Sequence, residues 1–148
     1  MNAHIHKPER RLCILVSDRD EESRGRIVSA LEAGYLKALE APTEQEALMI
    51  TKSEHCDLLI ADMQISADDG IEMLMDAWKL CQPSAPAILT SWERGLSVRR
   101  WALAHDAFAF LPKPLREGSV KLAVGKALCR WNSFDLSDAG TFSGQGAS

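Results

Sequence analysis

The chain has 148 residues, which is enough for one compact domain with a buried core and leaves no room for a second. The formal net charge of −4 argues against a nucleic-acid-binding surface, because such a surface needs concentrated Lys and Arg. No apolar run approaches the roughly 20 residues that cross a bilayer, and the polar start MNAHIHKPERR lacks the apolar segment of a secretory signal. We therefore expect a cytoplasmic protein with no membrane segment.

The first part of the chain predicts a disordered lead-in followed by a strand and a helix. Residues 1–11 are polar, and the apolar run at 12–16 predicts a short strand that is buried on both faces. A helix is predicted at 20–33, because Asp20 can cap its start and Gly34 can end it.

A second strand and helix follow, and then a third strand. Residues 36–41 predict a weaker strand, and Thr43 fits the cap of a helix that runs to about Ser53. The apolar run at 57–61 is the clearest buried strand in the sequence, and it ends at Asp62.

The remaining residues continue the alternation of helix and strand. The predicted segments are a helix at 71–81, a strand at 87–90, a helix at about 95–105, a strand at 107–111 and a helix at about 115–131. Residues 132–148 are rich in Gly, Ser and Asp, and we expect a disordered tail or linker there.

Polar side chains stand at the ends of four predicted strands. Alternating strands and helices with short connections predict a parallel sheet covered by helices on both faces. Sites in such sheets gather beyond the carboxyl ends of the strands, where Asp18, Asp62, Thr90 and Lys113 occur in order. Two carboxylates suit a hard cation such as Mg²⁺, and a hydroxyl and an ammonium suit phosphoryl oxygens. Together these groups predict a small phosphoryl-transfer site.

On these residues the chain resembles the response-regulator receiver family of two-component signalling, over about 12–131. ILVSDRD resembles the first strand and acidic turn of the family, and DLLIADMQISADDG resembles its phosphoacceptor strand and loop. EAPTEQEAL, AILTS and AFAFLPKP resemble the second, fourth and fifth strands with the residues that follow them. The resemblance implies a flavodoxin-like α/β fold, doubly wound around a five-stranded parallel sheet with strand order 2-1-3-4-5. It also implies a signalling domain rather than a turnover enzyme.

The resemblance further implies the roles of the acidic residues. Asp62 would accept a phosphoryl group from the phosphohistidine of a sensor histidine kinase or from a phosphotransfer protein. Mg²⁺ would be bound by Asp18, by Asp62 and by the backbone carbonyl of Gln64.

The switch residues are likewise implied by the resemblance. Lys113 would pair with a phosphoryl oxygen, and the Lys113–Pro114 peptide bond would be cis. Thr90 would move toward the phosphoryl group and Phe110 would turn inward. The face built by the fourth helix, the fifth strand and the fifth helix would then bind a downstream protein, and the resemblance leaves open whether two copies pair through it.

Arg19 is the clearest departure from the family, because receivers usually carry a second acid at this position. Losing that carboxylate should weaken Mg²⁺ binding. One hypothesis is that Arg19 points to solvent and that Asp18 and Asp62 still hold a weaker metal site. The other is that its guanidinium replaces the metal charge or pairs with Asp62, giving a degenerate receiver that signals without phosphate. The survival of the other site residues favours the first hypothesis.

Smaller departures concern the loops and an aromatic side chain. Ser66 stands where the family often has Pro, and Asp106 stands where it often has Gly. Trp92 occupies a position that tunes loss of the phosphoryl group to water in the family. We predict that its ring shields the site and slows dephosphorylation, the alternative being a partly buried anchor for the loop. Trp92 could also join Trp101 and Phe108 in an aromatic contact surface.

A small enzyme or nucleotide-binding protein on a flavodoxin-like sheet is the remaining alternative. It lacks support, because no GxGxxG or P-loop motif follows the first predicted strand. The sequence leaves open whether the chain is a stand-alone receiver or a fragment of a longer regulator.

Overall fold

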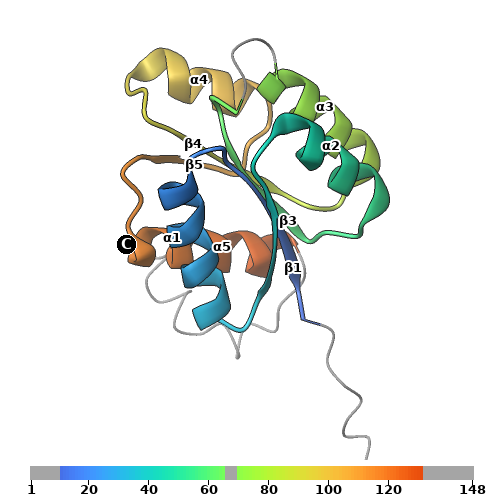
Figure 1. Ribbon diagram of the computed structural model, residues 1–148. Helices are drawn as coiled ribbons and strands as arrows, with labels where there is room; N and C mark the ends of the chain where they lie inside the picture. Colours follow the sequence, from blue (N-terminus) through green and yellow to red (C-terminus); the bar gives the residue numbers. More distant parts are fainter. Residues whose placement is uncertain (1–10, 66–69, 132–148) are drawn as a thin grey trace, which may run out of the picture.

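The computed structural model of the protein describes residues 11–65 and 70–131 (Figure 1). The segments predicted to be disordered, 1–11 and 132–148, lie outside the described residues except for Arg11. Ser66 also lies outside them. None of the helices in the described part combines the length and the apolar character that a membrane-spanning helix requires.

Strands and helices alternate through the described residues, as the sequence predicts. The strands are β1 (Cys13–Ser17), β2 (Lys37–Ala41), β3 (Leu58–Asp62), β4 (Ala87–Ser91) and β5 (Ala109–Pro112). The helices are α1 (Glu21–Ala33), α2 (Glu44–Ser53), α3 (Gly70–Cys81), α4 (Leu96–Ala104) and α5 (Glu117–Trp131). All strand pairs are parallel, and their order is β2-β1-β3-β4-β5, which confirms the predicted doubly wound fold. Figure 1 shows α1 and α5 on one face of the sheet and α2, α3 and α4 on the other.

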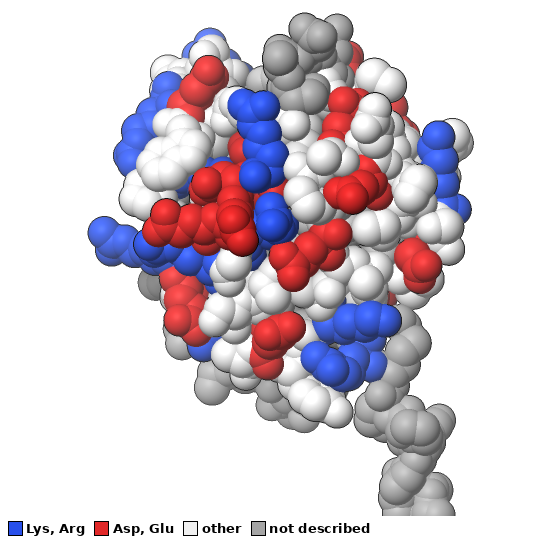
Figure 2. All heavy atoms as spheres, viewed as in Figure 1, with Lys and Arg blue, Asp and Glu red and all other residues white. Residues whose placement is uncertain are grey.

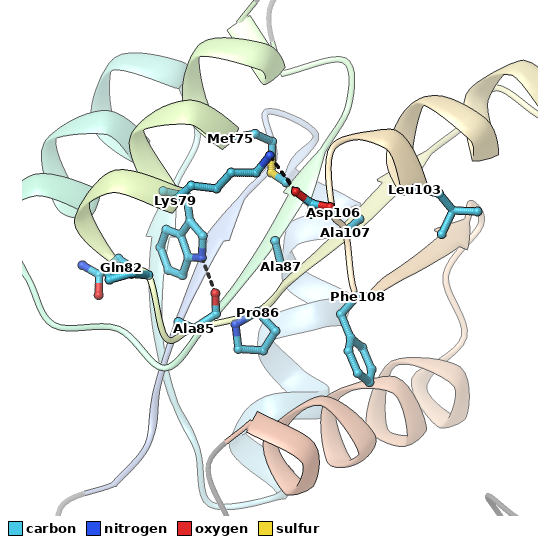
Figure 3. Close-up of a pocket in the computed structure, with 12 residues that line it drawn as sticks. Met75, Lys79, Gln82, Ala85, Pro86, Ala87, Leu103, Asp106, Ala107 and Phe108 are labelled. Atoms are coloured by element: carbon cyan, nitrogen blue, oxygen red, sulfur yellow. Dashed lines mark hydrogen bonds and ion pairs between the residues drawn. The ribbon is translucent and has the colours of Figure 1, made fainter.

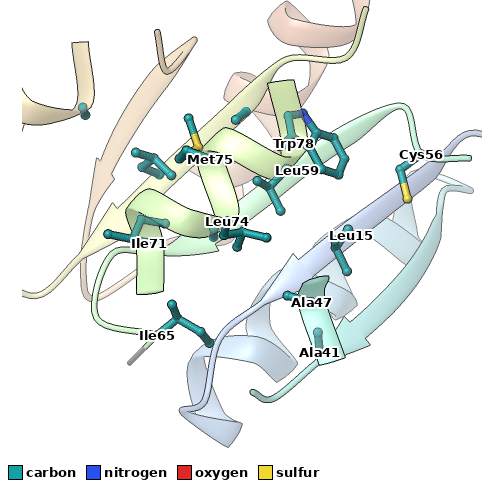
Figure 4. Packing of buried hydrophobic residues seen from close by; sticks show 14 of the residues in the cluster. Leu15, Ala41, Ala47, Cys56, Leu59, Ile65, Ile71, Leu74, Met75 and Trp78 are labelled. Carbon is teal, nitrogen blue, oxygen red and sulfur yellow. The ribbon is translucent and has the colours of Figure 1, made fainter. Parts of the chain in front are cut away.

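The three central strands separate two hydrophobic cores, because successive side chains of a strand point to opposite faces. Leu15 and Leu59 pack with Trp78 beneath α2, α3 and α4 (Figure 4). Ile14 and Ile60 pack instead against α1 and α5. Every residue of β1, β3 and β4 is buried, so continuous apolar runs mark these strands in the sequence.

Helix α1 begins and ends as predicted. The Asp20 side chain accepts a hydrogen bond from the Ser23 N–H at 3.0 Å, which caps the first turn. Gly34 is the C-cap residue, with a φ of −95°. The left-handed conformation that follows the helix is adopted by Tyr35, with a φ of 63°.

The fifth strand and fifth helix each begin two residues later than predicted. The Ala107 N–H closes the end of α4 by bonding to the Ala102 carbonyl at 3.0 Å, and β5 begins at Ala109. Asp106 adopts a left-handed conformation, with φ of 66°, which Asp tolerates better than most residues other than Gly. Helix α5 starts at Glu117 rather than at residue 115.

Candidate functional site

The four predicted polar residues lie at the carboxyl edge of the sheet. Asp18 directly follows β1, and Asp62 is the last residue of β3. Thr90 pairs with Asp62 on the adjacent strand β4. Lys113 follows β5, and its N–H donates to the Ser91 carbonyl at 2.8 Å, which holds it beside β4. Parallel pairing therefore brings residues that are far apart in sequence to one edge.

Lys113 joins the two carboxylates. Its ammonium nitrogen lies 2.9 Å from Asp18 Oδ2 and 3.1 Å from Asp62 Oδ2, and all three side chains are buried. The other carboxylate oxygens face the backbone. Asp18 Oδ1 accepts from the Asp20 N–H at 2.9 Å, and Asp62 Oδ1 accepts from the Gln64 N–H at 3.0 Å. Two carboxylates and one ammonium leave a single net negative charge at this buried centre.

Burial raises the pKa of the Asp18 carboxyl above its usual value of 3.8. Hydrogen bonding to Lys113 and to the Asp20 N–H lowers the pKa and offsets part of this effect, whereas the nearby charge of Asp62 adds to the rise. Asp18 is therefore held in an environment that disfavours its charged form.

The Thr90 hydroxyl is buried and, within the described residues, has no hydrogen-bond partner. The same holds for the hydroxyl of Ser17, the last residue of β1. Because nearly all buried polar groups are paired, an unpaired hydroxyl next to a carboxylate cluster calls for a physical reason.

A hollow of about 320 Å³ opens onto Asp62. The residues that line it are Arg19, Asp20, Asp62, Gln64, Trp92, Glu93 and Lys113. Arg19 is exposed and makes no ion pair with any described residue, so the hypothesis that it pairs with Asp62 is wrong for this structure. Trp92 is 56% exposed and stands at the entrance rather than in the core.

Sequence reasoning missed the polar network around Gln64. The Ser91 hydroxyl donates to Gln64 Oε1 at 3.1 Å and accepts from the Glu93 N–H at 2.9 Å. A serine directly after the predicted switch threonine was the available signal. Asp20 lines the hollow as well as capping α1, and hydrogen bonds from Ser23 lower the pKa of its carboxyl.

The oxygen donors at this edge fit a hard cation, but in a reduced set. Asp18, Asp62 and the Gln64 carbonyl are the kind of oxygen ligands that Mg²⁺ takes in proteins. The described residues hold no group of three or more acidic, His or Cys side chains that could bind a metal, and Lys113 already contacts both carboxylates. Asp18, Asp62 and the Gln64 carbonyl therefore fit a divalent cation that binds weakly, because few carboxylates are available and Lys113 competes for both.

The remaining predicted site residues occupy the neighbouring strand and loop. The Lys113–Pro114 bond is cis, the form that the resemblance implies. Phe110 is partly buried on β5, with the Arg99 guanidinium 5.2 Å from its ring centre.

Trp101 and Phe108 contact different cores. Trp101 packs on the α2–α4 side of the sheet, and its ring stacks on His105 with the ring centres 3.6 Å apart. Phe108 packs against the α1 and α5 core on the other side. A shared aromatic contact surface with Trp92 stays a prediction.

A larger hollow, of about 610 Å³, lies away from these groups (Figure 3). It is lined by residues that open β4 and by the end of α3, and Lys79 and Asp106 pair across it at 3.2 Å. Because it lies at the amino-terminal edge of the sheet, it takes no part in the carboxylate site.

The response regulator receiver domain family matches residues 14–124. The chain belongs to this family. Among related proteins, this receiver is 30% identical over 126 residues to the KDP operon transcriptional regulatory protein KdpE of Escherichia coli K12. The match covers 84% of the receiver and 55% of that relative, and the receiver spans about half or less of the curated relatives that it matches.

Solved receiver structures share the fold. A CheY-like receiver domain protein from Methanospirillum hungatei JF-1 has a TM-score of 0.76 at 22% identity, over 85% of this receiver and 100% of that chain. A Burkholderia pseudomallei response regulator, solved with a phosphorylated aspartic acid, a calcium ion and citrate, has a TM-score of 0.68 at 22% identity. That match covers 76% of this receiver and 65% of the Burkholderia chain.

Proposed function

We propose that this receiver accepts a phosphoryl group on Asp62 from a sensor histidine kinase or a phosphotransfer protein, and that the modified state changes a protein-interaction face. The observation that supports this most strongly is the contact of the Asp62 carboxylate with the buried Lys113 ammonium, next to the unpaired Thr90 hydroxyl.

The chemistry requires a nucleophile, positive charge and room for the donor. A carboxylate oxygen of Asp62 attacks phosphorus, and the bond from phosphorus to the donor nitrogen breaks, which leaves an acyl phosphate on the protein. The phosphoryl group carries about 1.5 to 2 negative charges, which replace the single negative charge of the carboxylate. The Lys113 ammonium already contacts Asp62, so it is close enough to pair with a phosphoryl oxygen. The hollow above Asp62, which Arg19 and Trp92 also line, gives the donor room to approach.

A divalent cation would be held by Asp18, Asp62 and the Gln64 carbonyl. When bound, it would neutralise charge on the phosphoryl oxygens. Because Arg19 takes the place of a third acid, we propose that Mg²⁺ binds but does so weakly. The Burkholderia receiver, which has the same fold, carries calcium together with its phosphorylated aspartate.

The response would begin at Thr90. Its buried hydroxyl has a free donor, and a phosphoryl oxygen on Asp62 would give that donor an acceptor. Phe110 lies on the neighbouring strand, so a shift of Thr90 can reach the face formed by α4, β5 and α5. We propose that a downstream protein binds this face. Acidic and basic side chains are interspersed on the part of the molecule visible in Figure 2, which does not favour a nucleic acid as the partner.

We also propose that the receiver acts in the cytoplasm. The cysteines among the described residues are free thiols, which suits a reducing compartment.

A degenerate receiver that acts without phosphate is the second candidate function. Arg19 favours it, because a positively charged residue lines the hollow above Asp62 at a position where the family usually carries an acid. In this case the pairing of Lys113 with both carboxylates would be the permanent state of the site.

A phosphodonor titration separates the two candidates. The protein is incubated with a small acyl phosphate or phosphoramidate, with and without Mg²⁺, and its mass is measured. We expect the parent to gain one phosphoryl group in the presence of Mg²⁺. Asp62→Asn should gain none, and Asp76→Asn, which changes an exposed aspartate of α3, should behave as the parent. A parent protein that gains no mass at saturating donor and Mg²⁺ would favour the degenerate receiver.

A further inference from the structure

Two buried thiols lie side by side at the edge of the sheet opposite to Asp62. Cys13 opens β1, and Cys56 stands two residues before β3. Both belong to the core beneath α2, α3 and α4, with 6% and 1% of their surface exposed. Cys56 is labelled in Figure 4. Both thiols belong to one buried cluster, and each influences the pKa of the other.

The backbone places the two cysteines close together. The Asp57 N–H donates to the Cys13 carbonyl at 2.7 Å, and the Cys13 N–H donates to Asp57 Oδ2 at 2.8 Å. Cys13 therefore lies beside Asp57, and Cys56 directly precedes Asp57, with consecutive Cα atoms ~3.8 Å apart. Because both side chains are buried in the same cluster, they lie on the same side of the sheet.

A buried glutamine fixes the segment that carries Cys56. The Cys56 N–H donates to Gln82 Oε1 at 3.3 Å, and Gln82 Nε2 donates to the carbonyls of Thr51 and Glu54 at 2.9 and 2.7 Å. Cys56 also lines a surface hollow of about 180 Å³, which Cys81 shares. A small oxidant therefore approaches from the side of Cys56, and these bonds hold the segment that carries Cys56 in place.

The two thiols differ in acidity. The hydrogen bond from Cys56 lowers the pKa of Cys13 to about 7, although burial acts in the opposite direction. The same bond, together with burial, raises the pKa of Cys56. At neutral pH the pair therefore offers one thiolate, which is the nucleophilic form, beside one protonated thiol.

We propose that Cys13 and Cys56 form a redox site that hydrogen peroxide converts from a dithiol to a disulfide. The Cys13 thiolate attacks one peroxide oxygen, the O–O bond breaks, and hydroxide leaves, so that Cys13 becomes a sulfenic acid. The Cys56 sulfur then attacks the Cys13 sulfur, the S–O bond breaks, and the departing hydroxide takes the Cys56 proton to form water. Two thiols and one peroxide give one disulfide and two water molecules. This site uses none of the residues of the carboxylate edge, so it does not depend on phosphorylation of Asp62.

Disulfide mapping tests the site in the intact protein. A Cys81→Ala/Cys129→Ala variant removes the more exposed thiols of the described chain and keeps the pair. The reduced variant is treated with peroxide at neutral pH and quenched, its free thiols are alkylated in denaturant, and a non-reduced digest is analysed by mass. We expect the loss of two hydrogen atoms and a peptide pair linking Cys13 to Cys56. A folded variant that keeps both thiols, while a free cysteine added at the same concentration is consumed, would overturn the proposal.

Single variants test which sulfur reacts first. Cys56→Ser should trap a sulfenic acid on Cys13, detected as an adduct with dimedone, and Cys13→Ser should leave Cys56 unlabelled. Circular dichroism establishes that each variant is folded before it is scored. Labelling of Cys56 but not of Cys13 would overturn the assignment, as would a Cys56–Cys81 link as the main product in the parent.

Discussion

The ammonium nitrogen of Lys113 lies 3.1 Å from Asp62 Oδ2, and neither side chain is more than 5% exposed. The same nitrogen lies 2.9 Å from Asp18 Oδ2, so one cation is shared by two buried carboxylates. A buried charge is tolerated only where it is paired, and each member of this cluster depends on the other two.

Lys113→Met should therefore lower the free energy of unfolding by about 3 to 5 kcal/mol, because it leaves two carboxylates buried without a cation. Urea denaturation at neutral pH measures the change. Lys121→Met is the matched control, since Lys121 is an exposed lysine that pairs with Glu117 one helical turn away. That variant should change stability by less than about 1 kcal/mol. Equal losses in the two variants would contradict the shared-cation account.

The pKa of Asp18 predicts how stability depends on pH. Since its folded pKa is raised above 3.8, the folded protein binds this proton more tightly than the unfolded chain does. The resulting stabilisation is complete below pH 3.8 and is lost as the pH rises through the folded pKa. Asp18→Asn cannot ionise, so its stability relative to the parent should increase as the pH rises from about 4 to neutral.

Urea denaturation of both proteins across this range measures the difference, and its slope with pH is the decisive quantity. The difference in free energy of unfolding between the two proteins also contains the altered contact with Lys113. That contribution does not depend on pH in this range, so only the slope tests the pKa of Asp18. Asp76→Asn, at an exposed position, should give a curve parallel to that of the parent. A difference between Asp18→Asn and the parent that falls as pH rises would refute the raised pKa.

The fold and the edge of the sheet could be predicted because their signals are local. A continuous apolar run such as the one before Asp62 marks a strand buried on both faces, and in a parallel sheet the end of each strand fixes the edge that its next residue reaches. Asp18, Thr90 and Lys113 could therefore be placed at one edge without any contact being known.

The contacts within that edge could not be predicted in the same way. Whether Lys113 pairs with one carboxylate or two depends on side-chain geometry, as does the bond from Ser91 to Gln64. The packing of Trp101 and Phe108 against different cores was also not predictable, because a single residue of register decides which face of a sheet a side chain takes. The pairing of Cys13 with Cys56 likewise depends on strand register, which the spacing of cysteines does not reveal.

Arg19→Asp should strengthen Mg²⁺ binding, because it restores an acid at the entrance to the site and removes a cation. We expect the Kd for Mg²⁺ to fall by about tenfold, the equivalent of ~1.4 kcal/mol. Quenching of the Trp92 fluorescence during a Mg²⁺ titration is the measurement, since its ring lines the same hollow. Arg26→Asp, on the exposed side of α1, serves as the control and should leave the Kd unchanged. Equal affinities for the parent and Arg19→Asp would show that Arg19 does not act on the cation.

Trp92→Ala should shorten the lifetime of the phosphorylated protein severalfold, because the ring stands at the entrance to the hollow above Asp62 and limits the approach of water. The phosphorylated protein is separated from its donor, and the loss of the phosphoryl group is followed by mass over time. Leu103→Ala removes an exposed apolar side chain of α4 that does not line this hollow, and it should decay like the parent. Identical lifetimes for the parent and Trp92→Ala would leave the ring as a loop anchor only.

Thr90→Val should stabilise the unphosphorylated protein while removing its response to phosphorylation. The Thr90 hydroxyl is fully buried and has no partner among the described residues, so its replacement by a methyl group of similar size removes a desolvation cost. We expect the free energy of unfolding to rise by about 1 kcal/mol in urea denaturation. Thr51→Val is the matched control, because the buried Thr51 hydroxyl donates to the Ala47 carbonyl at 2.7 Å and its loss should destabilise. If Thr90→Val loses as much stability as Thr51→Val, the hydroxyl has a partner in the resting state and is not held ready for a phosphoryl oxygen.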